Sequence, residues 1–482
     1  MLKCTYTLDH LMNYIFKNSI RLGALIILSL FFFSSFNAQK EIKRKPNFIV
    51  ILSDDQSWVG TSFLADPLDP RSKSDYYQTP NLERLAKSGM KMTNGYAPAP
   101  FCSPTRKSIL TGLTPAKHEY QKDRENWVHV FKKQLTIPKI LKMADPNYVT
   151  AHFGKWDARY DDFTPEEMGY DYSDGLTSNN TGGGKKIINK DGVDTPFVMG
   201  EAWPKTYDDP KLIFSLTKRS NDFMEEQTQK NKPFFIQISH YAVHLAITYS
   251  QKNINKYSKS KKGEKHFVPE FAAMTEDMDQ GIGLILDKVS SLDIADNTYI
   301  IFLSDNGGRS SIPIGSKQKK ARNFPLRGGK GSMYEGGLRV PFIVSGPGVS
   351  ENTHSNVPVT GLDILPTVAR LAGYKEPLPD ILDGGNLASI IHNNGEGSIE
   401  RNSPYLIFHQ AANRKPTSAI RWGNFKLVKD WRYNSLELFD LSKDVEEKND
   451  LSKEMPEIVN KLNIALILFL DKAKAETKQT ES

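Results

Sequence analysis

Cysteine is scarce in this chain of 482 residues, which contains only Cys4 and Cys102. Cys4 precedes an apolar run near the N-terminus, so removal of that run would leave Cys102 alone. A single cysteine has no partner within the chain, which excludes a disulfide framework. A small buried thiol is one interpretation of such a residue. The residues that follow it, Ser103-Pro104-Thr105-Arg106, favour a chemical role instead.

Long hydrophobic runs are lacking near the N-terminus, where the apolar run of residues 22–33 is too short to span a bilayer comfortably. Lys17 and Arg21 precede this run and the small residues of segment 34–38 follow it, a pattern typical of a signal peptide. We therefore predict a signal peptide over residues 1–38, with the export machinery as partner and a periplasmic or secreted product. An uncleaved N-terminal anchor is the alternative. No cysteine lies directly after the run, so lipid attachment there is not expected. No stable membrane anchor is expected either.

Nucleic-acid-binding motifs are absent, although the formal net charge is +7. The basic residues concentrate in segments 252–265 and 317–322. Such runs are usually solvated loops, and the alternative is attraction of a polyanion. Without a recognisable binding motif, no nucleic acid partner is expected, and another anionic polymer fits better. The contents of 39% hydrophobic and 25% charged residues are typical of a globular enzyme.

Several short apolar runs are typical of buried strands. They alternate with helical stretches such as 81–88 and 271–290, which predicts a mostly parallel sheet covered by helices on both faces. Ligands of such sheets bind beyond the carboxyl ends of the strands. The predicted strands are 47–53, 148–153, 233–239 and 299–304, and the polar residues that follow them are Asp54-Asp55, Gly154-Lys155, His240 with His244, and Asp305-Asn306.

A second, smaller unit is predicted near the C-terminus. It consists of short antiparallel strands followed by an amphipathic helix over residues 457–472, and the tail after Ala473 is expected to be frayed. The predicted strands are 405–408, 417–422, 425–429 and 435–441. We therefore divide the mature chain into a catalytic domain over 39–400 and a C-terminal subdomain over 401–476. Segment 178–196, rich in Gly and Asn, is expected to be a loop.

Five sequence blocks in a fixed order resemble the type I (formylglycine-dependent) sulfatases. The resemblance extends from about residue 46 to residue 451 and includes 437–441 and 449–451. It implies the alkaline-phosphatase-like α/β fold, with a mostly parallel sheet covered by helices and a smaller C-terminal antiparallel-sheet-plus-helix subdomain. The blocks are Asp54-Asp55-Gln56, 102–112 (CSPTRKSILTG), Gly154-Lys155-Trp156, Asp305-Asn306-Gly307-Gly308 and Arg327-Gly328-Gly329-Lys330-Gly331.

The block that contains Cys102 predicts a helix. Ser103 can cap it, Pro104 can occupy its first position and Gly112 can end it. Cys102 would then lie beside a helix N-terminus, which favours an anion such as sulfate, although a plain capped helix is an equal alternative. The resemblance implies that a formylglycine-generating or equivalent maturation enzyme oxidises Cys102. One hydroxyl of the hydrated aldehyde would attack sulfur, and the other would later expel sulfate.

A metal site is predicted from oxygen ligands at two strand ends, namely Asp54, Asp55, Asp305 and Asn306. This set suits Ca²⁺, with Mg²⁺ less favoured, rather than zinc. Helix capping or turn formation is the alternative for Asp54-Asp55 alone. The cation would polarise a sulfate oxygen. The resemblance adds Cys102 as a metal contact and makes Asp305 the candidate acceptor of the nucleophile's proton.

Four further residues are candidates for catalysis. Arg106 lies one helical turn from Cys102 and can return to the same site. The resemblance implies that Lys155 and Lys330 contact sulfate, where a fixed ammonium stabilises developing negative charge. It also implies that His244 donates a proton to the departing oxygen. A hydrogen-bonded structural role is the alternative for His244.

One position departs from the family pattern. The usual Gly-Lys-Trp-His is replaced by Gly154-Lys155-Trp156-Asp157. In the family, the histidine at this position contacts the nucleophile and is suited to removing its proton when sulfate leaves. Three interpretations stay open: Asp157 has this role, His152 reaches in from the preceding strand, or Asp157 binds substrate. His240 is a further substrate-binding candidate that faces either the cleft or the core.

The sequence therefore predicts a hydrolase of sulfate esters that acts on a sulfated carbohydrate or polysaccharide. Two alternatives are kept. The chain is a phosphatase or phosphonate hydrolase of the same superfamily, or it is a non-catalytic binder of sulfated glycans.

Overall fold

The computed structural model describes residues 12–14, 16, 44–122, 131–158, 163–179, 187–188, 194–195, 208–312, 320–412 and 415–477. Residues 1–44 and 45–482 are separate units, and the second is described here by itself. The predicted signal peptide therefore lies almost wholly outside the described residues, as do residues 317–319 and most of loop 178–196. No helix among the described residues is long and apolar enough to cross a bilayer.

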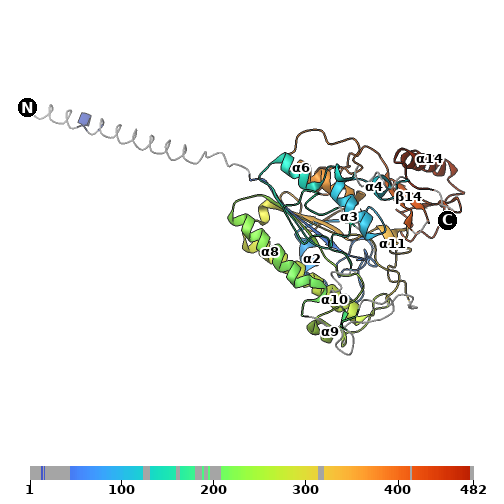
Figure 1. Ribbon diagram of the computed structural model, residues 1–482, viewed down its shortest axis with the longest axis horizontal. Coiled ribbons are helices and arrows are strands. Elements are labelled where there is room, and N and C mark those ends of the chain that lie inside the picture. The colour runs from blue at the N-terminus through green and yellow to red at the C-terminus, as the bar shows by residue number, and fades with distance from the viewer. Residues whose placement is uncertain are drawn as a thin grey trace, which may run out of the picture. The chain divides into compact units, whose positions relative to one another are not determined.

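An eight-stranded, mostly parallel sheet forms the centre of the unit, as predicted (Figure 1). Its central strands β9, β1, β8 and β4 are parallel neighbours, whereas β10 pairs antiparallel with β9 and β2. The strand order is β11 (Thr353–Ser355), β2 (Gly89–Met92), β10 (Phe342–Ser345), β9 (Thr298–Ser304), β1 (Asn47–Ser53), β8 (Phe234–Ser239), β4 (Val149–Gly154) and β5 (Tyr172–Ser173).

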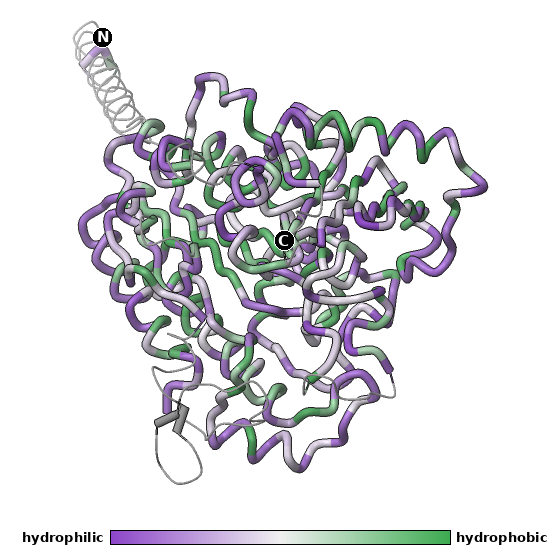
Figure 2. Tube along the Cα trace, turned by 45° about the vertical axis from the view of Figure 1, so that its right-hand side comes forward, coloured by the Kyte–Doolittle hydropathy of each residue, from purple (hydrophilic) through white to green (hydrophobic). Residues whose placement is uncertain are grey.

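Helices cover both faces of this sheet. Along β1 the side chains alternate, so that Phe48 and Val50 pack into one apolar core and Ile49 and Ile51 into the other. This two-sided burial explains why the strand is apolar without interruption. Helices α3 (Cys102–Thr111), α6 (Ile137–Ala144) and α12 (Ile364–Leu371) cover the first face, and α2 (Pro80–Lys87), α8 (Ile213–Gln229) and α10 (Pro269–Ser291) cover the second (Figure 1). Figure 2 shows green, hydrophobic stretches of chain running through the interior and purple, hydrophilic stretches along much of the outside.

A four-stranded antiparallel sheet follows in the C-terminal part of the chain, as predicted. Helix α14 (Pro456–Lys472) packs on one face through Leu462 and Leu466. The other face packs on segment 333–338 of the larger domain through Phe408 and Phe439. The strands are β13 (Leu406–Gln410), β14 (Thr417–Trp422), β15 (Phe425–Asp430) and β16 (Ser435–Asp440).

The tail after Ala473 is not frayed over its first residues, contrary to the prediction. Ala475 forms a bridge with Gln121, and the Glu476 amide donates to the Tyr120 carbonyl over 2.7 Å. These bonds pair the tail with the segment after α4 (Pro115–His118). Such long-range backbone pairing leaves no trace in a local sequence pattern.

A buried ionic cluster joins the C-terminal sheet to the loop that contains Lys330. Lys426 Nζ lies 2.8 Å from Glu335 Oε1 and 2.9 Å from Glu447 Oε1. The Glu335 amide in turn donates to Glu447 Oε2 over 2.7 Å. Burial opposes ionisation of Glu335, but Lys426 and Arg339 outweigh it and lower its pKa. Lys426 therefore bridges two buried carboxylates, and Arg339 pairs with Glu335 as well at 2.6 Å.

We predict that Lys426→Met lowers the free energy of unfolding by about 3–5 kcal/mol, because it leaves Glu447 buried without its cation and Glu335 with Arg339 as its remaining salt-bridge partner. Guanidinium unfolding of both proteins measures this difference. Lys443→Met is the matched control, since Lys443 is 84% exposed and pairs with Asp440 at 3.6 Å. An unchanged midpoint for Lys426→Met would show that the cluster does not stabilise the fold.

Candidate active site

The carboxyl ends of β1 and β9 bring the predicted acidic residues together. The register pairs Ser53 with Ser304, so Asp54-Asp55 and Asp305-Asn306 leave the sheet side by side. The Asp55 amide donates to Asp305 Oδ1 over 3.1 Å. Asn306 Nδ2 donates to Asp55 Oδ1 over 2.8 Å. All of these side chains are buried.

Helix α3 delivers Cys102 to this cluster. Cys102 Sγ and carboxylate oxygens of Asp54 and Asp305 all lie within 4.8 Å of one another. Gly112 ends the helix in the left-handed conformation, with φ 68°, as predicted.

The predicted start of α3 is wrong. The helix begins at Cys102 rather than Pro104, and its N-cap is the extended residue Phe101, which has no capping side chain. Ser103 Oγ makes no hydrogen bond within the described residues. Thr105 stabilises the entry instead, because its hydroxyl bonds both the amide and the carbonyl of Ala99.

Three cationic side chains hold the carboxylates. Arg106 donates to Asp305 Oδ2 from Nε over 3.0 Å and from a terminal nitrogen over 2.7 Å. Lys155 Nζ donates to Asp54, and Lys330 Nζ donates to Asp55. Arg106 also donates to the Lys155 carbonyl over 2.7 Å. The structure thus brings Arg106, Lys155 and Lys330 to the same acidic cluster.

Glycines explain how the two lysines reach the site. Gly154 has φ 92°, and a Cβ there would lie 2.1 Å from the Ser239 carbonyl oxygen, so only glycine lets β4 end beside β8. A Cβ at Gly329 would lie 2.6 Å from the Gly308 carbonyl oxygen, which accepts the Lys330 amide. The glycines around Lys330 therefore make room for neighbouring backbone.

Protonation states follow from burial and from these ion pairs. Burial raises the pKa of Cys102 to about 11, against the opposing charges of Lys155 and Lys330. Burial opposes ionisation of Asp54, but Lys155 and His244 outweigh it and lower its pKa. Burial and the charge of Asp54 raise the pKa of Asp305 above its usual range, although Arg106 binds it. At neutral pH the thiol is protonated, which makes it a poor nucleophile.

His244 lies at the edge of the cluster. Its Nε2 is 3.8 Å from Asp55 Oδ2, its Nδ1 bonds the Leu245 carbonyl, and its side chain is 13% exposed. Burial lowers its pKa to about 4 against the charges of Asp54 and Asp55. The imidazole is therefore neutral near pH 7 before substrate binds.

The three residues considered where the chain departs from the family pattern, at residue 157, lie in different surroundings. Asp157 Oδ2 is 3.5 Å from Lys155 Nζ, and the charge of Asp157 acts on Cys102. His152 Nε2 is 3.2 Å from Ser239 Oγ, and its ring packs against the edge of Trp156. The His240 ring is fully buried and makes no hydrogen bond within the described chain. Of the three, Asp157 is the residue that lies in ion-pair distance of Lys155.

Two basic residues were not predicted. Arg309 Nε is 3.2 Å from Asp55 Oδ2, and the only signal for it is its place after Gly307-Gly308. Lys211 Nζ is buried without a hydrogen bond to a described residue, and it faces the charge of Asp54. Burial lowers the pKa of Lys211 to about 7. No sequence motif surrounds Lys211.

The donor set fits a hard divalent cation. Asp54 Oδ1, Asp55 Oδ2 and Asn306 Oδ1 are buried and accept no hydrogen bond from a described residue. Such oxygens are costly to bury unless a donor or cation satisfies them. Because carboxylate and amide oxygens are the ligands of Ca²⁺ and Mg²⁺, the residues suit that class of ion.

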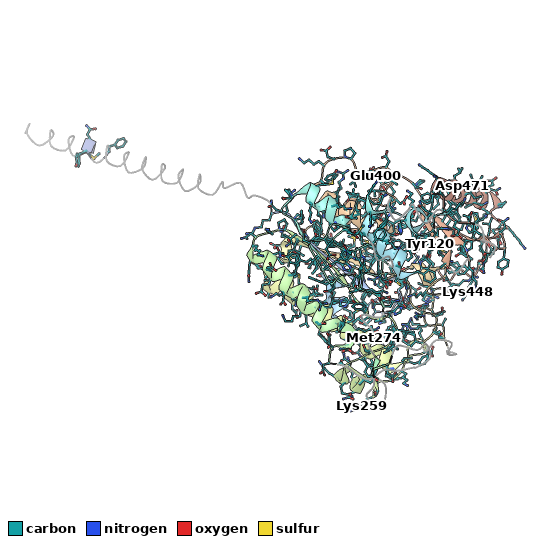
Figure 3. The ribbon with its side chains drawn as sticks, viewed as in Figure 1. Tyr120, Lys259, Met274, Glu400, Lys448 and Asp471 are labelled. Carbon is teal, nitrogen blue, oxygen red and sulfur yellow. The ribbon has the colours of Figure 1, made fainter. Side chains whose placement is uncertain are left out.

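The lysine-rich segment 252–265 does not belong to this cluster. Lys259, labelled in Figure 3, lies beside α9 (Gln251–Tyr257) and well apart from α3. Lys256 pairs with Glu276 at 2.7 Å. A pocket of about 730 Å³ is also elsewhere, between β11 and the turn at Gly423.

Comparison with known proteins identifies the family. Residues 46–374 match the sulfatase family model, and residues 329–471 match a model described as N-sulphoglucosamine sulphohydrolase, C-terminal. A sulfatase of Formosa agariphila is 28% identical over 96% of this chain and 95% of its own length. Human N-acetylgalactosamine-6-sulfatase is 27% identical over 71% of this chain and 65% of its own length.

Solved structures agree with this result. The crystal structure of Ps i-CgsB has a TM-score of 0.70 and 25% identity, and the match covers 89% of this chain and 93% of that one. The same protein has been solved in complex with k-i-k-neocarrahexaose. The family match, the parallel sheet and the motif order agree, and the chain belongs to the sulfatase family, with the alkaline-phosphatase-like fold and the activity of a sulfuric ester hydrolase.

Proposed function

We propose that this enzyme removes sulfate from a sulfated carbohydrate with a nucleophile made from Cys102. The observation that supports this most is the meeting of Cys102 Sγ with carboxylate oxygens of Asp54 and Asp305 within 4.8 Å. The carbohydrate class is supported by the relatives, since one acts on N-acetylgalactosamine 6-sulfate by name and another binds a neocarrahexaose. Export of the mature chain after residue 38 is part of the same proposal.

The nucleophile requires oxidation of Cys102 by a maturation enzyme. The buried thiol is protonated at neutral pH, because its pKa is raised to about 11. It also has no second hydroxyl with which to release a bound sulfate. A hydrated aldehyde at this position has two hydroxyls: one attacks sulfur while the sugar oxygen leaves, and the other loses its proton so that the aldehyde re-forms and sulfate departs.

A bound divalent cation, preferably Ca²⁺ rather than Mg²⁺, would polarise a sulfate oxygen and favour the ionised nucleophile. Asp54, Asp55, Asp305 and Asn306 are its proposed ligands, with Cys102 as a further contact. Asp305 also accepts the proton of the attacking hydroxyl, a role that its raised pKa suits. Arg106 keeps Asp305 in place through two hydrogen bonds.

Lys155 and Lys330 stabilise the negative charge on the sulfate oxygens. Both ammonium groups already lie beside Asp54 and Asp55. His244 donates a proton to the departing sugar oxygen. Its pKa is low in the free enzyme, and the negative charge of a bound sulfate raises it toward neutrality.

Asp157 is our candidate for the base that starts sulfate release, because its charge acts on Cys102 and its carboxylate lies 3.5 Å from Lys155. His152 and His240 then have a supporting role behind the site. We predict that Asp157→Asn lowers kcat by about 10²-fold or more and makes the sulfated enzyme accumulate. Mass spectrometry of the protein during turnover measures the accumulated species. His152→Asn is the control: accumulation in that variant instead would assign the base to His152.

The proposed function is tested by free sulfate release from a panel of sulfated oligosaccharides, with aryl and steryl sulfates beside them. Release from at least one oligosaccharide is expected. The ratio of sulfatase to phosphatase rates on matched esters decides against the phosphatase alternative. Glycan binding without release by the oxidised, calcium-supplied enzyme would support the non-catalytic alternative and refute the proposal.

A further inference from the structure

Arg309 differs from the other cations of the site, because it pairs with a carboxylate without a hydrogen bond and its side chain is partly exposed. Its Nε lies 3.2 Å from Asp55 Oδ2 but donates no hydrogen bond to a described residue. Its backbone is held, since Arg322 donates to the Arg309 carbonyl over 3.1 Å. The side chain is 29% exposed, compared with 3% for Arg106 and 0% for Lys155. Arg309 thus connects the acidic cluster with solvent.

The site has one positive charge in excess once the divalent cation and the sulfate monoester bind. Without these two, the cationic side chains equal the carboxylates in number. A divalent cation adds two positive charges, and one sulfate monoester removes only one. The buried amine of Lys211 adds to this excess rather than reducing it. The groups counted are Arg106, Lys155, Arg309 and Lys330 against Asp54, Asp55, Asp157 and Asp305.

Asp55 cannot remain the partner of Arg309 in the loaded enzyme. Lys330 and Asn306 already donate to Asp55 Oδ1. Asp55 Oδ2, the oxygen nearest Arg309, is one of the oxygens that suit a cation. A cation there would repel the guanidinium, which then has only its solvent side on which to find an anion. A guanidinium binds carboxylate and sulfate-like groups with two parallel hydrogen bonds.

We propose that Arg309 binds a second anionic group of the substrate, a sulfate or a carboxylate close to the sulfate that is hydrolysed. This inference rests on the proposed function and narrows its substrate class to sugars with at least two negative charges. Arg309 is then a specificity-determining residue rather than part of the bond-breaking machinery.

The test uses the oxidised, calcium-loaded enzyme and one oligosaccharide in three forms: with one sulfate, with a second sulfate, and with a uronate carboxylate instead. The readout is kcat/KM for sulfate release. Wild-type enzyme is expected to prefer one or both of the doubly charged forms. In Arg309→Gln the ratio of kcat/KM for the preferred form over the singly sulfated form falls about tenfold or more, mainly through KM. The form that is preferred identifies the anion.

Arg309→Lys keeps the charge but loses the planar group that donates two parallel hydrogen bonds. Its ratio is therefore expected to lie between those of wild type and Arg309→Gln. Arg84→Gln is the matched control, since Arg84 is 46% exposed on α2 and pairs with Asp287. Sulfate release with the same ratio in wild type and Arg309→Gln would overturn this inference alone. No release by wild-type enzyme from any form would overturn the proposed function and this inference with it.

Discussion

Replacement of Cys102 by alanine is expected to lower kcat for sulfate release by about 10⁵-fold or more, because it removes the precursor of the nucleophile. Binding of the sulfated substrate should persist, since Lys155, Lys330 and the metal ligands are unchanged. Cys102→Ser separates the two halves of the reaction. Its single hydroxyl can accept sulfate but cannot expel it, so this variant is expected to stop after one turnover with sulfate attached.

Stopped-flow release of the alcohol and intact mass measure these outcomes. Cys4→Ser is the matched control, because it makes the same change in a residue that the predicted signal cleavage removes. Multiple turnovers by Cys102→Ser at the wild-type rate would contradict the proposed nucleophile. A normal thermal midpoint for both Cys102 variants guards against loss of fold as the cause.

Removal of divalent cations is the second change with a large expected effect. Chelation should lower kcat/KM by about 10³-fold or more, since the cation stabilises the charge of the transition state by about several kcal/mol. Added Ca²⁺ should restore activity, and Mg²⁺ should restore less of it. The reason is structural: three buried oxygens, those of Asp54, Asp55 and Asn306, have no hydrogen-bond donor among the described residues.

Asp54→Asn should remove most of the response to Ca²⁺. A second readout does not depend on turnover, because an ion that binds only the folded state raises the thermal midpoint. Wild-type enzyme is expected to show this rise and Asp54→Asn is not. Asp287→Asn, in an exposed pair on α10, is the control that should behave as wild type. Full activity after exhaustive chelation, with no rise on adding Ca²⁺, would exclude a metal at this site.

The sheet could be predicted because its central strands are buried on both faces. An uninterrupted apolar run such as 47–53 has few alternatives to a strand in a parallel sheet. Observed strand β1 has the predicted bounds. Strands β8 and β9 differ from theirs by one residue at the start, and β4 is shifted by one residue at both ends. The antiparallel neighbour β10 and the edge strands were not predicted, because short or partly exposed strands have a weaker pattern.

The gathering of Asp54, Asp55, Asp305 and Asn306 also followed from the sequence, since parallel strands end at one edge of a sheet. Their distances did not. The start of α3 was misplaced, because Ser103 has the residue type of a cap whereas Thr105 makes the hydrogen bonds. A propensity cannot distinguish between two hydroxyls separated by one residue.

Contacts between distant segments account for what the sequence left open. Asp157 could be weighed against His152 only once the fold was known to place its charge near Cys102. Arg309 and Lys211 are ordinary basic residues in the sequence, and only the fold places their charges beside Asp55 and Asp54. Pairing of Glu476 with Tyr120 is another contact of this kind.

The most direct test of the central claim is the mass of tryptic peptide 92–106, which contains Cys102, in preparations of known specific activity. Conversion of the thiol to an aldehyde lowers the mass of this peptide by about 18 Da. We predict that the converted fraction rises in proportion to sulfatase activity across preparations made with and without the maturation enzyme. A fully active preparation in which this peptide is present only as the thiol would contradict the claim that Cys102 is the precursor of the nucleophile.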